Sequence, residues 1–165
     1  MNTYKNEYYK TRMSKAGGLN AGRCDGAVGT DAAADAEAFN ILQANRPSMG
    51  RDAEDIAFNV RSVRRFVLPL VALSLPNSEL ETFRTISHEG AFPTVPRAMM
   101  FAIAMAMLGL SDIEVVEAPK SNHPNRVLFT HRGTFALKDM TTFAVMFSQL
   151  AVVHEGAYIG WSAAI

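Results

Sequence analysis

The segment between Arg97 and Asp112 contains no charged residue and consists almost entirely of Ala, Met, Ile, Leu and Phe. Pro96 suits the first turn of a helix, where a missing N–H is not needed, and Gly109 suits the position after the last turn. The sequence therefore predicts a helix over Ala98–Leu110 that is apolar on every side. A bilayer span takes about 20 apolar residues, so we expect this shorter helix to be buried inside the fold or between subunits.

Three further helices are predicted upstream from their start signals. The first follows Asp31, a suitable N-cap residue, and runs through an alanine-rich stretch. The second begins at Ser48 or Asp52 and repeats Ala, Ile and Val at helical spacing. The third follows Ser78, which opens the capping-box pattern S-x-x-E, and continues to about Ser87. Between the second and third, Pro69 interrupts the apolar run 66–75, which favours an edge strand or an extended buried segment.

Downstream of Gly109 the pattern changes from helices to strands. The stretches "DIEVVEAP", "RVLFT" and "TFALK" are predicted to form three strands, with Arg132-Gly133 as a tight hairpin turn between the last two. The stretch 141–165 is predicted to be one long apolar helix. Helices and strands thus come in runs, which predicts an α+β fold. We expect a single compact domain in which a small antiparallel sheet of three to four strands packs against apolar helices.

Residues 1–30 are predicted to form an extended basic and glycine-rich arm in front of an α+β body over residues 31–165. The stretch "AGGLNAGRCDGAVGT" holds five of the 11 glycines and too little apolar surface to offset its own ordering entropy. Cations interleaved with tyrosines suit either nucleic acid or a neighbouring subunit. Because the whole chain has zero net charge, subunit contact is the preferred role. The candidate contact residues are Tyr4, Lys5, Tyr8, Tyr9, Lys10, Arg12 and Lys15.

Two segments, Ser87–Phe92 and Val153–Tyr158, share the core His-Glu-Gly-Ala followed by an aromatic residue. We call them the HEGA segments. A histidine in the last turn and a glycine after it are typical of a helix end, so both segments are predicted to end a helix. Gly90 and Gly156 should then have positive φ angles. The alternative is that the two segments converge to form a catalytic or metal site, whose residues would be His88, Glu89, His154 and Glu155.

The remaining composition makes several kinds of chemistry improbable. Cys24 is the only cysteine, so no internal disulfide is expected, and one cysteine with four scattered histidines matches no zinc spacing. His123 and His131 are predicted to be exposed in a loop and near a hairpin turn. No phosphate-binding glycine motif or nucleophile motif occurs. We therefore expect no metal, no cofactor and no enzyme activity.

The leading hypothesis is a structural subunit of a large homo-oligomeric assembly, of the virion or capsid type found in bacteriophages, with an arm that contacts neighbouring subunits. Its partners would be copies of itself and other assembly subunits, with nucleic acid as a further partner of the basic arm. It would act in the virion or the cytoplasm, without a signal peptide and without a membrane span. The alternatives are a small enzyme or metal-binding protein using the HEGA segments, and a membrane-associated protein using residues 141–165.

Overall fold

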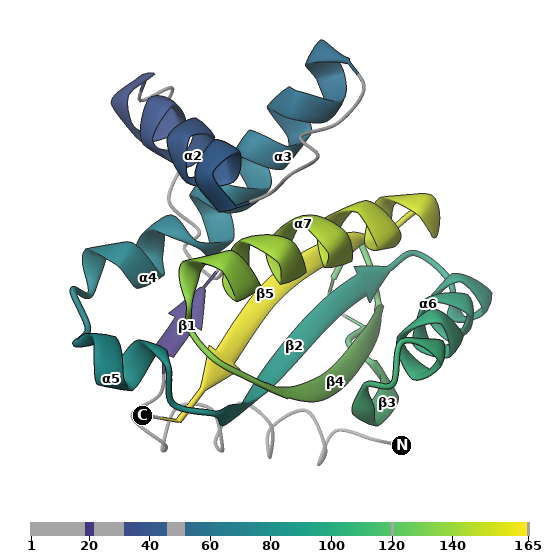
Figure 1. Cartoon of the computed structure of the whole chain (residues 1–165). Coiled ribbons are helices and arrows are strands. Elements are labelled where there is room, and N and C mark those ends of the chain that lie inside the picture. Colours follow the sequence, from purple (N-terminus) through teal and green to yellow (C-terminus); the bar gives the residue numbers. More distant parts are fainter. Residues whose placement is uncertain (1–18, 22–31, 46–51, 120, 165) are drawn as a thin grey trace. The chain divides into compact units, whose positions relative to one another are not determined.

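The computed structural model describes residues 19–21, 32–45, 52–119 and 121–164 (Figure 1). The chain divides into two units. Of the described residues, the sheet unit contains 19–20, 84–119, 121–132 and 148–164, and the helical unit contains 21, 32–45, 52–83 and 133–147. Together they give an α+β protein with an antiparallel sheet, as the sequence predicts.

The sheet has the strand order β1-β5-β2-β4-β3. Strand β2 is antiparallel to β5, and β3 is antiparallel to β4. At the centre, the side-chain amide of Asn125 donates to the carbonyl oxygen of Phe92 at 3.5 Å. The start of β4 therefore meets the end of β2, and these strands are also antiparallel. The strand bounds are β1 Leu19–Ala21, β2 Arg84–Phe92, β3 Ser111–Glu117, β4 Asn125–Gly133 and β5 Ala157–Ala163.

Two helices connect these strands. Helix α6, Val95–Met107, lies between β2 and β3 in the sequence, and helix α7, Leu137–Val153, lies between β4 and β5. From β2 to β5 the chain has the order β-α-β-β-α-β, and in the sheet β5 lies beside β2 and β4 lies beside β3. This is the split-βαβ or ferredoxin-like arrangement. This arrangement supports many unrelated functions, so function has to be argued from individual surfaces and sites.

Helix α6 packs along β2 and β3 through one apolar side (Figure 1). Its N-cap is Thr94, whose hydroxyl accepts a hydrogen bond from the backbone N–H of Arg97, and the chain turns after it at Gly109 with φ 78°. The fully buried Phe101 lies 4.8 Å from Phe92 and 5.9 Å from Phe129, measured between ring centroids. This aromatic cluster forms the core between α6 and the sheet. A helix is confirmed here, although it runs from Val95 to Met107 rather than from Ala98 to Leu110, and only one side of it is buried in the described chain.

The helical unit contains the first two predicted helices and two short ones. Its helices before β2 are α2 Ala32–Asn45, α3 Ala53–Phe66, α4 Leu68–Ala72 and α5 Asn77–Leu80. Asp52 caps α3 by accepting a hydrogen bond from the backbone N–H of Asp55 at 2.9 Å. Helices α2 and α3 pack together, and Arg64 forms an ion pair with Asp35 at 2.7 Å. The start signal proposed at Asp31 lies outside the described residues.

The extended segment predicted around Pro69 is wrong, because this stretch forms helix α4. Pro69 lies in the first turn of α4, where a proline removes no helical hydrogen bond and its fixed φ favours the helix. The helix predicted from Ser78 is also shorter than expected. It is the single turn α5, and the chain has already become strand β2 at Arg84.

The predicted hairpin at Arg132-Gly133 is also wrong, since β4 continues to Gly133 and α7 follows at Leu137. The side chain of Thr134 accepts from the N–H of Ala136 and donates to Asp139 at 2.7 Å, which organises the start of α7. The long helix predicted over 141–165 is wrong in its second half. Helix α7 ends at Val153 and the chain then becomes β5.

Candidate functional site

The two HEGA segments lie side by side in the sheet unit. In the β2–β5 register, Gly90 is opposite Tyr158 and Ala91 is opposite Ala157. The first segment is part of strand β2, so its predicted helix end is wrong. The second does follow a helix, but the residue with positive φ there is Glu155, at 58°, and neither HEGA glycine has a positive φ. The pairing joins the segments through their backbones and through a hydrogen bond between the side chains of His88 and Tyr158.

Both HEGA glycines are explained by the ring of Phe92. A Cβ atom added to Gly90 would lie 2.9 Å from Cε2 of Phe92. A Cβ atom added to Gly156 would overlap the same ring and lie 2.6 Å from the carbonyl oxygen of Ala91. Contacts this short are repulsive, so the two glycines leave the space that the fully buried Phe92 side chain occupies.

A chain of buried polar groups crosses this part of the core. Nδ1 of His88 is 2.7 Å from the hydroxyl oxygen of Tyr158, and Nε2 of His88 is 2.7 Å from Nδ1 of His131. The side chains come from β2, β4 and β5, and His88 also stacks on Phe129 with 5.0 Å between ring centroids. Either Tyr158 donates to His88 and His88 to His131, or both donations are reversed, and each arrangement satisfies the pair of bonds with neutral rings.

Burial favours the uncharged forms of His88 and Tyr158. Desolvation, and secondly the neighbouring His131, lower the pKa of His88 well below its usual 6.5. Desolvation also raises the pKa of Tyr158 well above its usual 10.0. Both shifts favour the neutral form, because charge in the low-dielectric core is costly. A buried hydrogen-bonded network of this kind helps to specify how strands pack together.

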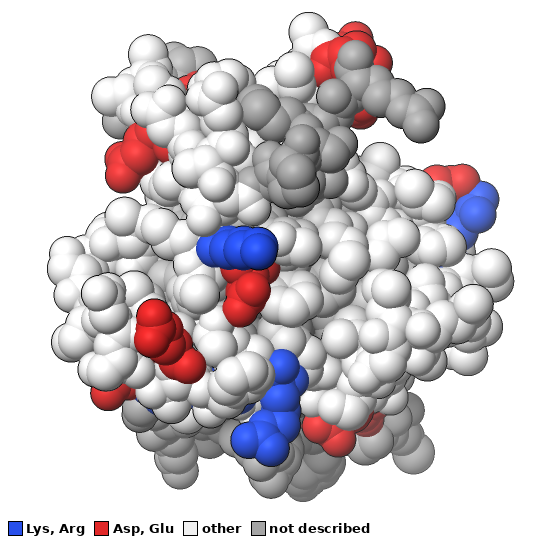
Figure 2. Space-filling model, viewed as in Figure 1, with Lys and Arg blue, Asp and Glu red and all other residues white. Residues whose placement is uncertain are grey.

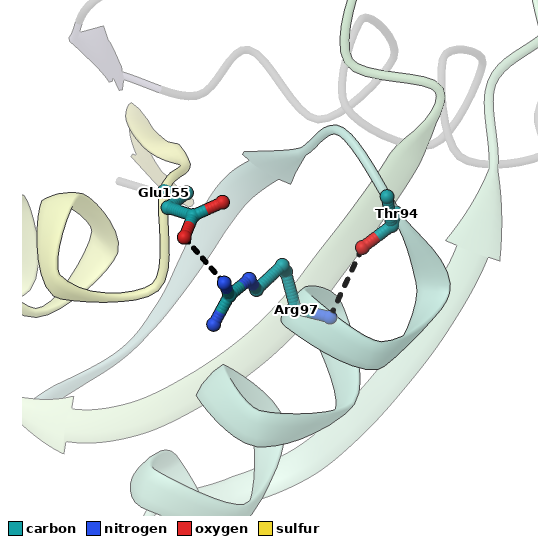
Figure 3. Close-up of polar contacts among 3 residues, drawn as sticks. All are labelled: Thr94, Arg97 and Glu155. Carbon is teal, nitrogen blue, oxygen red and sulfur yellow. Dashed lines mark hydrogen bonds and ion pairs between the residues drawn. The ribbon is translucent and has the colours of Figure 1, made fainter.

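The other members of the HEGA segments point to separate partners. Glu89 forms an ion pair with Arg126 at 3.6 Å, and the ring of His154 contacts Phe101 edge-on. Glu155 pairs with Arg97 at the start of α6, as Figure 3 shows. Across the described part of the chain, no group of three or more His, Cys, Asp or Glu side chains could hold a metal ion. The convergence that a shared catalytic or metal site requires is therefore not observed.

One further prediction is wrong, one role was not anticipated, and several predicted residues lie outside the described part of the chain. His131, predicted to be exposed, is 7% exposed and takes part in the buried chain, because β4 continues through it instead of ending in a hairpin. The partner role of Tyr158 was not predicted, since that residue was assigned to a helix. The predicted arm contacts Tyr4, Lys5, Tyr8, Tyr9, Lys10, Arg12 and Lys15, together with Cys24, lie outside the described residues.

The most unusual surface of the sheet unit is the outward side of α6. Its buried side consists of Ala98, Phe101, Ala102 and Met105. Its outward side is also apolar, and its side chains are exposed to between 46% and 84%. Figure 2 shows a largely uncharged surface over α6, at the right of the view, with one acidic and one basic patch at its upper edge. We call this surface the α6 face, and its residues are Val95, Met99, Met100, Ile103, Met107 and Leu108.

No family model, curated protein or solved structure matches the chain. Among the described residues, no helix is both long enough and apolar enough to span a membrane. The α6 face and the buried Tyr158–His88–His131 chain are therefore assessed on their own chemistry. The first is an exposed apolar surface, and the second lies in the core.

Proposed function

We propose that this protein is a structural subunit that assembles with copies of itself, and that the α6 face is its self-association surface. The observation that carries the proposal is the exposure of six large apolar side chains on one helix. They present on the order of 500–600 Å² of apolar surface, the upper end of what monomeric proteins expose in one patch. Surface of this kind is stabilised by removal from water, at about 25 cal/mol per Å².

The chemistry of the α6 face suits an identical partner. No charged residue occurs from Ala98 to Ser111, so two copies can meet over this stretch without burying a like-charge pair. The centres of protein interfaces are depleted of charge and enriched in methionine, and Met99, Met100 and Met107 supply flexible side chains that adapt to a facing surface. A catalytic role has no comparable support, because the HEGA side chains have separate structural partners.

Within this class, the proposed assembly is a virion-type shell in which the arm at residues 1–30 adds contacts between subunits. A closed shell needs more than one kind of contact per subunit, since a single self-complementary patch gives only a dimer. The α6 face would provide one of these contacts and the arm another. Electron microscopy of the purified full-length protein tests the shell directly by the presence or absence of closed particles.

The association itself is tested by measuring the mass of the full-length protein in solution between about 1 and 50 µM, a range chosen for interfaces of micromolar affinity. Light scattering after size exclusion should give a multiple of the 18.0 kDa chain mass. Met107→Lys, at the most exposed position of the α6 face (84%), should reduce that mass. Phe83→Lys, at a 68% exposed apolar residue of the helical unit, is the matched control and should leave it unchanged.

A wild-type protein that remains monomeric at 50 µM would overturn the proposal. So would equal masses for Met107→Lys and the wild type. Circular dichroism of each variant shows that a change in mass does not come from unfolding, because an exposed substitution away from special contacts changes stability by only about 0.5 kcal/mol.

A further inference from the structure

We infer that two copies of the protein pair α6 against α6 in antiparallel orientation, around a two-fold axis that passes close to Ile103. This inference rests on the proposed function and specifies how its surface is used. In such a pair, Ile103 of one copy faces Ile103 of the other, and Met99 of one copy faces Met107 of the other. The contact is isologous, because the same patch is used on both sides.

The spacing of the exposed side chains is symmetric about Ile103. Met99 lies four residues before it and Met107 four residues after it, so an antiparallel copy places methionine on methionine at both ends. All three positions are about half exposed or more, at 46%, 51% and 84%. Positions four apart lie on one side of a helix, so these residues form one continuous stripe. A stripe with a branched aliphatic centre and flexible ends is complementary to itself.

Electrostatics favour the antiparallel orientation over the parallel one. The N-terminal end of a helix carries a partial positive charge and the C-terminal end a partial negative one, so antiparallel helices place unlike ends together. The nearest charged side chains have the same signs as the two helix ends, positive at the N-terminal end and negative beyond the C-terminal end. Arg97, paired with Glu155, lies at the first end (Figure 3), and the exposed Asp112 lies just beyond the second. A parallel pair would place Arg97 beside its own copy.

The area is sufficient for a specific contact of modest strength. Two α6 faces together would bury on the order of 1,000–1,200 Å², the lower end for specific protein interfaces. The end of α7, which lies beside α6 through the His154–Phe101 contact, carries two more exposed apolar residues of the sheet unit. These are Val152 and Val153, at 53% and 69% exposed.

Cysteine cross-linking of the full-length chain tests the orientation, with Cys24→Ser removing the native thiol. In this background, Ile103→Cys alone should form a disulfide dimer under mild oxidation, because the two positions meet at the axis. Met99→Cys alone should not, since its two copies would lie about 12 Å apart along the helix axes, beyond the Cα separation of about 7 Å that a disulfide permits. Met107→Cys alone should likewise fail.

Mixing a tagged Met99→Cys protein with untagged Met107→Cys protein should give a disulfide heterodimer. Phe83→Cys is the matched control for random collision and should remain reduced. If the protein is oligomeric but each of the three single variants cross-links to itself, the helices pair in parallel and the inference is wrong while the proposed function stands. If the protein is oligomeric and none of the α6 variants cross-links, another surface carries the assembly and the inference again fails.

Discussion

The two HEGA segments share four consecutive residues and a following aromatic residue, yet they form different structures. The first segment is part of the central strand β2, and its histidine is 2% exposed. In the second, the chain leaves helix α7 and its histidine is partly exposed. Strand β2 alternates buried and more exposed residues up to Gly90 and pairs on both sides, whereas the second segment begins at the end of a helix of 17 residues. The surrounding chain, and not the motif itself, decides the structure and the role of each residue.

The largest expected difference between the segments is at their histidines. His88→Ala should lower the free energy of unfolding by about 3 kcal/mol, because it leaves a cavity and removes partners from buried polar groups. His154→Ala removes a partly exposed ring with one edge-on contact and should cost less than about 1 kcal/mol. Urea denaturation of both variants measures the difference. Equal costs would mean that the buried chain does not stabilise the sheet unit.

The glycines should differ in the same experiment because they approach Phe92 differently. Gly156→Ala should cost about 3 kcal/mol, since the added methyl meets both the ring and a backbone oxygen. Gly90→Ala meets only side-chain atoms, at 2.9 Å and 3.3 Å, and should cost about 1 kcal/mol. Adding Phe92→Leu supplies a control, because a smaller side chain gives the Gly90 methyl room while the Ala91 carbonyl still opposes the Gly156 methyl. If Phe92→Leu reduces the cost of Gly156→Ala but not the cost of Gly90→Ala, the result contradicts this geometry.

The sequence predicts elements well where local signals agree and poorly where tertiary pairing decides. The N-cap Asp52 locates α3, and the first-turn proline Pro96 with the uninterrupted apolar run locates α6. The pattern "HEG" also suits a helix end and so does not by itself predict strand β2, although Ile86, His88 and Gly90 alternate with more exposed residues. Recognising that alternation would have placed His88 on the core side. Its partners Tyr158 and His131 are 70 and 43 residues away, and no local pattern indicates such contacts.

The buried histidine should also make stability depend on pH. Since burial lowers the pKa of His88 in the folded state below 6.5, the unfolded chain binds a proton that the folded chain does not as pH falls below about 6.5. Stability is therefore complete above that pH and is lost on acidification, with a slope of up to about 1.4 kcal/mol per pH unit from this group. His88→Leu should have a shallower acid slope in urea denaturation between pH 8 and pH 5. Salt should leave the difference in slopes unchanged, because desolvation is its main cause.

The smallest expected difference between the segments is at their glutamates. It tests whether the more buried ion pair contributes more to stability than the more exposed one. The Glu89–Arg126 side chains are 13% and 20% exposed, against 62% and 44% for Glu155 and Arg97. Glu89→Gln should therefore cost about 1 kcal/mol and Glu155→Gln less than about 0.5 kcal/mol, since water screens the exposed pair. Half-molar salt should remove the second effect and leave most of the first. If salt removes both effects equally, the Glu89 pair is as solvated as the Glu155 pair, and the contrast between the segments is confined to their histidines and glycines.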